Sequence, residues 1–156
     1  MENQSQDFRD MLSSLNNAGV EYLVVGAFAV GLHGLARATK DIDLWVRPTA
    51  ENAERVWQAL VDFGAPLNAV NQDDFKLPDT VFQIGVAPVR IDLLSSVEGL
   101  EFDQAWEGRI QTRLLGEPVS VLNREDLLTS KRAAGRDRDL IDADRLENEV
   151  DPESRL

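Results

Sequence analysis

The chain has 156 residues, 43% hydrophobic and 28% charged, which is the balance of a single globular domain. The absence of cysteine and the presence of only one histidine, His33, exclude disulfide scaffolds, thiol nucleophiles and multi-histidine metal sites. A net charge of −12 excludes a broad basic surface for nucleic acid. The polar first 16 residues contain no signal-peptide core, and no apolar run reaches the ~20 residues that span a bilayer. We therefore expect a soluble, cytoplasmic protein.

The apolar pattern predicts both helices and strands. Apolar spacings of three and four indicate helices, whereas short apolar or alternating runs bounded by glycine or proline indicate strands. The expected helices cover residues 8–15, 27–35, 49–63, 102–106, 123–134 and 136–149. The expected strands cover residues 21–26, 41–46, 81–84, 89–94, 109–115 and 118–122. This succession predicts an α+β (mixed α/β) domain, with a mixed sheet flanked by helices and a helical C-terminus.

Local signals add detail to this prediction. Residues 1–6 are polar and expected to be frayed, residues 7–150 form one domain, and residues 151–156 form a tail. Gly116-Glu117 is expected to be the two-residue turn of a hairpin. The last helix is expected to bury one apolar stripe, made of Leu140, Ala143, Leu146 and Val150.

The segment Asp41-Ile42-Asp43-Leu44 carries the first chemical signal. Residues i and i+2 of a strand share a face, so the two aspartates project together while Ile42 and Leu44 face the core. Adjacent carboxylates repel each other unless a cation lies between them, and oxygen ligands suit Mg²⁺ or Mn²⁺. The alternative is that both aspartates lie on a solvated strand face.

A third carboxylate, Asp92, lies in the apolar strand expected at 89–94. If this strand is next to the one at 41–46, Asp92 can join Asp41 and Asp43. Three carboxylates could then hold two metal ions ~4 Å apart, as in-line phosphoryl chemistry requires. Arg90 would lie on the same face and could pair with them.

Gly26-Ala27 joins the expected strand at 21–26 to the helix that follows. Glycine permits a tight turn and close backbone approach, and the first N–H groups of a helix can bind an anion such as phosphate. Taken alone, the junction favours a purely structural turn, because strand–glycine–helix junctions are common in proteins.

Together these residues resemble the nucleotidyltransferase superfamily, which includes DNA polymerase β and the minimal nucleotidyltransferases. Its motif is a hydrophobic residue and Gly-Gly or Gly-Ser, then roughly nine to thirteen residues, then Asp-hydrophobic-Asp/Glu-hydrophobic, with a later third carboxylate. Here Val25-Gly26-Ala27 is followed by Asp41-Ile42-Asp43-Leu44 and later by Asp92. The stretches VGAFAVGLHGLARATKDIDLWV and SKRAAGRDRDLIDADRL look like the group of AbiEii-type toxins and related small transferases.

The resemblance implies a mechanism. Asp41 and Asp43 would bind two Mg²⁺ ions, or Mn²⁺, and through them the triphosphate of an NTP such as ATP. Asp92 would complete the acceptor-side metal site and help to deprotonate the attacking hydroxyl. The Gly26-Ala27 turn would hold the β- and γ-phosphates through backbone N–H groups. Alanine replaces the family's serine or glycine at position 27, so no hydroxyl is available there.

Basic residues near this motif are candidates for phosphate contact. Lys131 is expected on the helix at 123–134, and related enzymes carry a lysine in a comparable helix. Arg37, Thr39 and Lys40 lie between the glycine turn and Asp41 and could contact phosphate or acceptor. Each of these four residues could equally be an ordinary solvated side chain.

The one basic patch of the chain consists of Lys131, Arg132, Arg136 and Arg138. It could direct RNA toward the site, or it could pair with the acidic last helix. Asp139 and Asp142, in that helix, are expected to cap it or to pair with arginines. His33 is expected to be a packed histidine rather than a base.

Two functions are therefore predicted. The leading one is Mg²⁺-dependent transfer of an NMP from an NTP to a hydroxyl of RNA or tRNA, a protein or a small molecule, as part of a toxin–antitoxin system or outside one. The alternative is a non-catalytic module of the same fold that binds a nucleotide or a cognate protein partner.

Overall fold

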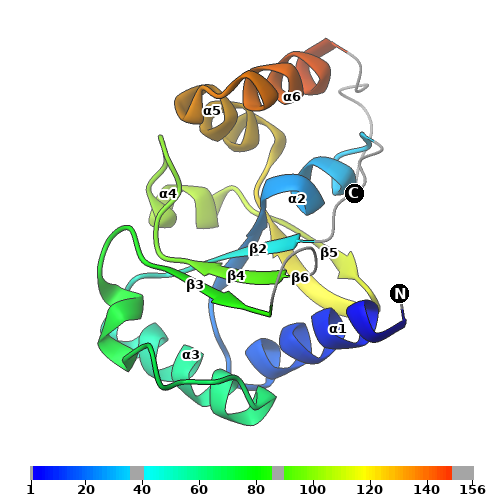
Figure 1. Ribbon diagram of the computed structural model, residues 1–156. Coiled ribbons are helices and arrows are strands. Elements are labelled where there is room, and N and C mark those ends of the chain that lie inside the picture. Colours follow the sequence, from blue (N-terminus) through cyan, green and yellow to red (C-terminus); the bar gives the residue numbers. More distant parts are fainter. Residues whose placement is uncertain (1, 36–40, 86–89, 149–156) are drawn as a thin grey trace.

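The computed structural model describes residues 2–35, 41–85 and 90–148. Its centre is a six-stranded sheet in the order β3-β4-β2-β1-β6-β5 (Figure 1). The strands are β1 (Tyr22–Val25), β2 (Asp41–Val46), β3 (Val81–Ile84), β4 (Arg90–Leu94), β5 (Ile110–Leu114) and β6 (Glu117–Val121). β2 pairs in parallel with β4, and β1 in parallel with β6, whereas β1–β2 and the two edge pairs are antiparallel. The sheet is therefore mixed, as predicted.

Helices cover both faces of the sheet. They are α1 (Glu2–Asn17), α2 (Gly26–Leu32), α3 (Ala50–Phe63), α4 (Phe102–Glu107), α5 (Arg124–Ala134) and α6 (Asp137–Asn148), with a short 3₁₀ helix η1 (Gln72–Lys76). In Figure 1, α1 and α3 lie below the sheet, and α2, α5 and α6 lie above it. No helix in the described ranges is long and apolar enough to cross a membrane.

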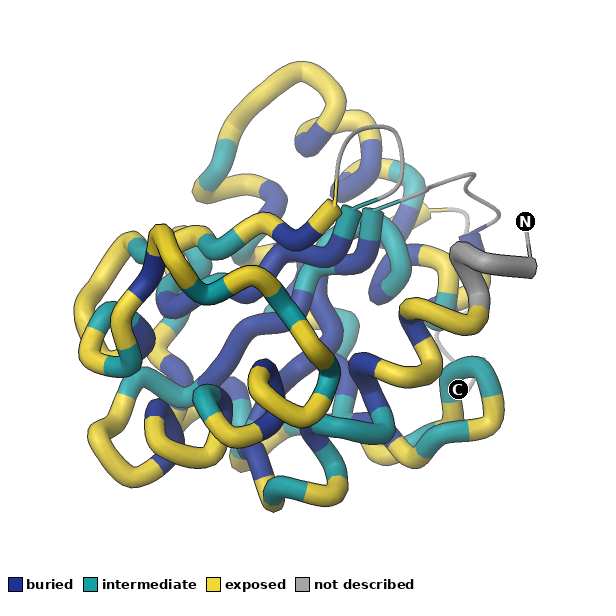
Figure 2. Tube along the Cα trace, turned by 60° about the horizontal axis from the view of Figure 1, so that its bottom comes forward, coloured by how far each residue is buried: buried dark blue, intermediate teal, exposed yellow. Residues whose placement is uncertain are grey.

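The core lies between the central strands and the lower helices. β1 is buried along its whole length, and Met11, Leu12 and Leu15 of α1 are fully buried against the sheet. Figure 2 shows the buried residues gathered in the middle strands, with exposed residues in the outer turns and helix faces (Figure 2). On β2, Ile42 and Leu44 are fully buried and alternate with the partly exposed Asp41 and Asp43. The strand therefore presents its aspartates away from this core, as its alternating sequence predicted.

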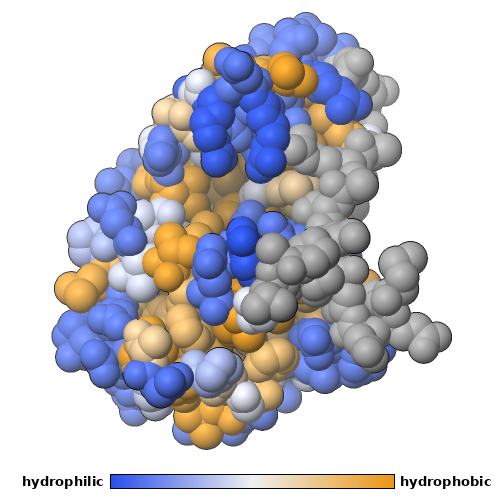
Figure 3. Space-filling view, in the orientation of Figure 1, coloured by the Kyte–Doolittle hydropathy of each residue, from blue (hydrophilic) through white to orange (hydrophobic). Residues whose placement is uncertain are grey.

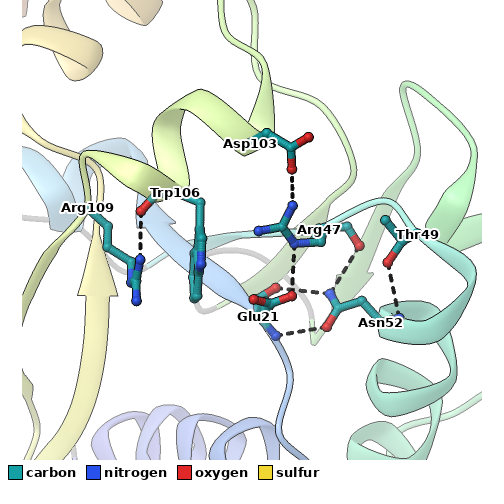
Figure 4. A network of polar contacts seen from close by, with 7 residues as sticks. All are labelled: Glu21, Arg47, Thr49, Asn52, Asp103, Trp106 and Arg109. Carbon is teal, nitrogen blue, oxygen red and sulfur yellow. Dashed lines mark hydrogen bonds and ion pairs between the residues drawn. The ribbon is translucent and has the colours of Figure 1, made fainter.

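The end of β2 is held by a polar network around Arg47 (Figure 4). Its guanidinium donates to Glu21 and Asp103 and lies over the ring of Phe102 at 4.7 Å. Asn52 of α3 is buried; it accepts the N–H of Glu21 and donates to the carbonyls of Glu21 and Arg47. These contacts join the starts of β1 and α3 to the end of β2, so they hold the strand that carries Asp41 and Asp43.

Two expected boundaries were wrong. α1 begins at Glu2, well before Phe8, because a helix can extend through polar residues that carry no apolar stripe. The β5–β6 turn consists of Leu115-Gly116 rather than Gly116-Glu117, since Leu114 pairs with Glu117. Both turn residues have positive φ, 54° and 83°, as a type I′ turn requires to match the strand twist.

The expected apolar stripe of α6 was also wrong in part. Ala143 and Leu146 are buried, but Leu140 is 47% exposed, and Val150 lies outside the described residues. The aspartates Asp139 and Asp142 take the buried positions instead, with 1% and 2% exposed. These aspartates pack against the charged side chain of Lys131, so charged rather than apolar residues take the buried positions of the helix.

Candidate active site

The two acidic strands are neighbours. β2 and β4 run in parallel, with Asp43 opposite Asp92 and Asp41 opposite Arg90. Asp92 is buried, and it lies near enough to Asp43 for its charge to raise the pKa of that residue. The sheet therefore brings together the three aspartates that the sequence singled out, from segments about 50 residues apart in the chain.

Arg90 is the countercharge of this group. Its Nε and Nη2 donate to the two carboxylate oxygens of Asp92 at 3.1 and 3.3 Å, and Nη2 lies 3.5 Å from Asp41 Oδ2. One guanidinium thus faces three carboxylates, so the cluster keeps a net formal charge of two negative. The expected pairing of Arg90 with these carboxylates is confirmed.

Asp43 has the most perturbed carboxyl of the cluster. Burial, and then the nearby charge of Asp92, raise the pKa of Asp43 from 3.8 to about 6. Asp41 raises it further, and Arg90 opposes the shift. A carboxylate in such a position gains most from a cation that replaces its lost hydration.

Gly26 is required at the start of α2 for two reasons. Its φ of +69° lies in the region that other residues rarely adopt. In addition, a Cβ at this position would overlap Oδ2 of Asp43. The close backbone approach expected at Gly26-Ala27 is therefore present, and the surface that it approaches is the carboxylate of Asp43.

A cavity of about 210 Å³ opens beside these groups. Gly26 at the start of α2 and Asp43 of β2 line one side of it, and Lys131 of α5 and Asp139 of α6 line another. Figure 3 shows the surface hollowed between the α5–α6 end of the molecule and the strands, with apolar residues in the hollow (Figure 3). The cavity lies where a ligand could contact the acidic strand and the basic helix at once.

Lys131 is not the exposed lysine of the alternative interpretation. The residue is 9% exposed, and its Nζ lies 3.5 Å from Asp139 Oδ1 and 3.2 Å from Asp142 Oδ2. Arg136 also binds Asp139, with 2.6 Å between Nε and Oδ2. Burial alone would raise the pKa of Asp139, but the hydrogen bond from Arg136 and the charge of Lys131 lower it overall. The α5–α6 cluster, defined by these four residues, is formally neutral.

The remaining predicted site residues are distributed as follows. Arg37, Thr39 and Lys40 lie outside the described residues. Of the basic patch, Arg132 pairs with Glu147 and Arg138 is exposed, so much of its charge meets the acidic last helix. His33 is a packed histidine: its Nε2 lies 2.8 Å from the carbonyl oxygen of Leu122, and burial lowers its pKa.

Some residues that line the cavity were not predicted as site residues from the sequence. Ser96, Val97 and Glu98 follow β4 directly, and Ser130 precedes Lys131. The signal for the first three was their position a few residues beyond Asp92, at the end of a strand that carries a candidate ligand. Residue type alone did not distinguish them from other loop residues.

The donor set suits a hard divalent cation. Asp43 and Asp92 present adjacent carboxylate oxygens, and Asp43 lacks full compensation for its charge. Oxygen donors of this kind favour Mg²⁺ or Mn²⁺. In the described part of the chain, no group of three or more acidic, histidine or cysteine side chains is arranged to hold a metal ion. Asp41 lies against Arg90, with 3.5 Å between Oδ2 and Nη2.

The family comparison decides the class of protein. A family described as "Nucleotidyltransferase of unknown function (DUF6036)" matches residues 5–154. The chain belongs to this nucleotidyltransferase family. Membership favours the transferase over the non-catalytic module as the interpretation of the acidic strands. No curated protein matches this chain in sequence.

Solved structures share the fold of this nucleotidyltransferase. One is a protein from Thermotoga maritima described as a candidate nucleotidyltransferase, with a TM-score of 0.61, 14% identity and 91% of each chain covered. Another is the lincosamide antibiotic adenylyltransferase LnuA with lincomycin bound, with a TM-score of 0.59 and 19% identity, covering 92% of this chain and 96% of that one. At these identities the likeness establishes the fold, and it confirms the predicted fold class.

Proposed function

We propose that this enzyme transfers an NMP from an NTP to a hydroxyl of an acceptor in a reaction that depends on Mg²⁺, with Mn²⁺ as a possible substitute. The single observation that carries the proposal is that Asp43 lies opposite Asp92 in the sheet, with Gly26 so near the Asp43 carboxylate that a Cβ there would overlap it. Membership of a nucleotidyltransferase family supports the same chemistry.

The three aspartates would hold the metal. Asp41, Asp43 and Asp92 would bind one or two ions, which, when bound, neutralise the charge that develops on the phosphoryl oxygens. Asp92, next to Asp43 in the sheet, would help to deprotonate the attacking hydroxyl. Arg90 would keep Asp92 oriented through its two hydrogen bonds. The hydroxyl oxygen attacks the α-phosphorus, and pyrophosphate leaves.

The glycine turn beside Asp43 and Lys131 of α5 would receive the triphosphate. Gly26 and Ala27 begin α2, and the first N–H groups of a helix have no intrahelical acceptor. Lys131 lines the same cavity from α5 and would contact the phosphates with its ammonium. Arg37, Thr39 and Lys40 stay candidates for the same role. These donors would orient the triphosphate so that its α-phosphorus faces the aspartates.

The acceptor class stays open in this proposal. The candidates are RNA directed by Lys131, Arg132, Arg136 and Arg138, a protein hydroxyl and a small molecule. A cognate protein of a toxin–antitoxin pair is a candidate binding partner, separate from the acceptor. LnuA, which is named for a small antibiotic, supports the small-molecule candidate through its fold alone.

Label transfer tests the proposal. Purified protein is incubated with each α-³²P-labelled NTP, Mg²⁺ and a cell extract, and the products are then digested with ribonuclease or protease to identify the acceptor class. We expect one class to be labelled by the wild type and not by the Asp41→Ala/Asp43→Ala variant. Asp62→Ala, which removes an exposed carboxylate from α3, is the matched control and should label normally. Equal labelling by the wild type and the double variant would contradict the assignment.

A further inference from the structure

The buried side of α6 is unusual in its chemistry. Asp139 and Asp142 are 1% and 2% exposed, whereas Leu140 and Ile141, on the same helix, are 47% and 60% exposed. Buried ion pairs are commonly no more stabilising than apolar residues of similar size, because the charges lose their hydration. Stability alone therefore gives no reason to bury two aspartates and to expose a leucine and an isoleucine.

Both buried aspartates meet one lysine. Lys131 Nζ lies 3.5 Å from Asp139 and 3.2 Å from Asp142. A lysine ammonium has three N–H donors on a flexible four-carbon side chain. The Lys131 ammonium therefore lies between two carboxylates of α6, which restrict its position. Lys131 also lines the cavity that contains Gly26 and Asp43, so its ammonium can serve a ligand there.

The two aspartates differ in their access to that cavity. Asp139 lines it and also binds Arg136, so it could contact a ligand itself. Asp142 is not among the described residues that line the cavity. Asp142 can therefore act on a ligand through its charge or through residues that it contacts, and Lys131 is a contact that lines the cavity.

We propose that Asp142 is a positioning residue, which holds the Lys131 ammonium toward the triphosphate of the bound NTP. The inference rests on the proposed function. The α5–α6 pair is built to keep this geometry: Arg124, at the start of α5, donates to the carbonyls of Leu146 and Glu147, near the end of α6. The two helices are thereby joined at their far ends, while Lys131, Asp139 and Asp142 join them near the cavity.

Charge and position make opposite predictions for the variant Asp142→Asn. This substitution removes one negative charge from a neutral cluster, so a purely electrostatic role would make an anion bind more tightly. Loss of positioning would instead leave the Lys131 side chain free to adopt other rotamers, and the same anion would bind more weakly. The sign of the change therefore distinguishes the two roles.

Calorimetric titration with Mg²⁺-tripolyphosphate, which lacks base and sugar, measures this sign. We expect Asp142→Asn to weaken binding about 10-fold, a typical effect of losing an outer hydrogen-bond partner of a ligating group. Asp142→Glu keeps the charge but moves the carboxylate, and we expect it to weaken binding as well. Asp144→Asn removes the same charge from the exposed side of α6 and should leave the affinity near that of the wild type.

A double-mutant cycle separates positioning from general damage. In a Lys131→Met background, Asp142→Asn should have no further effect on tripolyphosphate affinity, whereas an effect through folding would persist. Circular dichroism identifies which of the variants Asp142→Asn and Asp142→Glu are folded. The tripolyphosphate affinity of either folded variant tests the inference. Binding as tight as the wild type, or tighter, by a folded variant overturns the inference alone. If the wild type itself binds no tripolyphosphate, the proposed function fails, and the inference fails with it.

Discussion

Two ion clusters face the same cavity, and they differ in charge balance. The sheet cluster sets Asp41, Asp43 and Asp92 against the single guanidinium of Arg90. The α5–α6 cluster sets two carboxylates against two cations. Unbalanced carboxylates are suited to recruit a cation, whereas a balanced buried cluster holds its members in place. In the proposed function, this difference would let one cavity combine a site for a metal with a positioned donor for phosphate.

The largest expected contrast comes from making the same substitution in both clusters. Asp43→Asn should lower transfer by about 10³-fold, because a metal ligand beside the reacting phosphoryl group is lost, and should leave the unfolding free energy unchanged or higher because repulsion is relieved. Asp139→Asn should lower the unfolding free energy by about 3 kcal/mol, because it removes one of the two carboxylates that neutralise the buried Lys131. Urea denaturation and label transfer measure the two effects. A larger loss of stability in the Asp43 variant would refute the contrast.

A change of backbone tests how tightly the sheet cluster is enclosed. Gly26→Ala combines a strained φ, costing about 1 kcal/mol, with overlap against Asp43, and should lower transfer by about 10²-fold. Gly19→Ala is the matched control, because φ there is +75° and a Cβ would meet nothing within 4 Å. In urea denaturation, the unfolding free energy of Gly19→Ala should fall by the same strain energy, about 1 kcal/mol, and the variant should keep its activity. Equal activity in both variants would show that the contact with Asp43 is unimportant.

The raised pKa of Asp43 predicts a pH dependence for the metal-free protein. The carboxyl has a pKa of about 6 when folded and 3.8 when exposed, so between these values the folded state binds more protons. Its contribution to stability is present below about pH 4 and is lost as the pH rises through about 6. Relative to Asp43→Asn in EDTA, the wild type should therefore lose about 2 kcal/mol over this range. Urea denaturation at several pH values measures the difference, and a constant difference would contradict the shift.

The smallest expected effect concerns the exposed side of α6. Leu140→Ala should change the unfolding free energy by no more than about 0.5 kcal/mol, because its side chain is half exposed. Leu146→Ala, at a fully buried position of the same helix, should cost about 2–5 kcal/mol. Chemical denaturation compares them. A large cost at Leu140 would restore the apolar stripe first expected from the sequence.

Local sequence determined the elements that carry the sheet cluster. The alternation of Asp41 to Leu44 predicted a strand with both aspartates on one face, and the isolated Asp92 predicted a similar one. The cap Asn123, whose side chain accepts the N–H of Asp126, predicted the start of α5, and Gly135 predicted its end. These signals are short-range, because strand alternation and helix capping depend on residues within one turn or pleat.

Tertiary structure alone decided which of these residues meet. The parallel pairing of β2 with β4 put Asp43 opposite Asp92, and a β-strand's sequence does not state its neighbour. The burial of Asp139 and Asp142, with Leu140 outside, was likewise hidden in the sequence, since periodicity assumes that the buried side of a helix meets an apolar partner. Here that partner is Lys131, so the charge of a residue on another helix decides which side of α6 is buried.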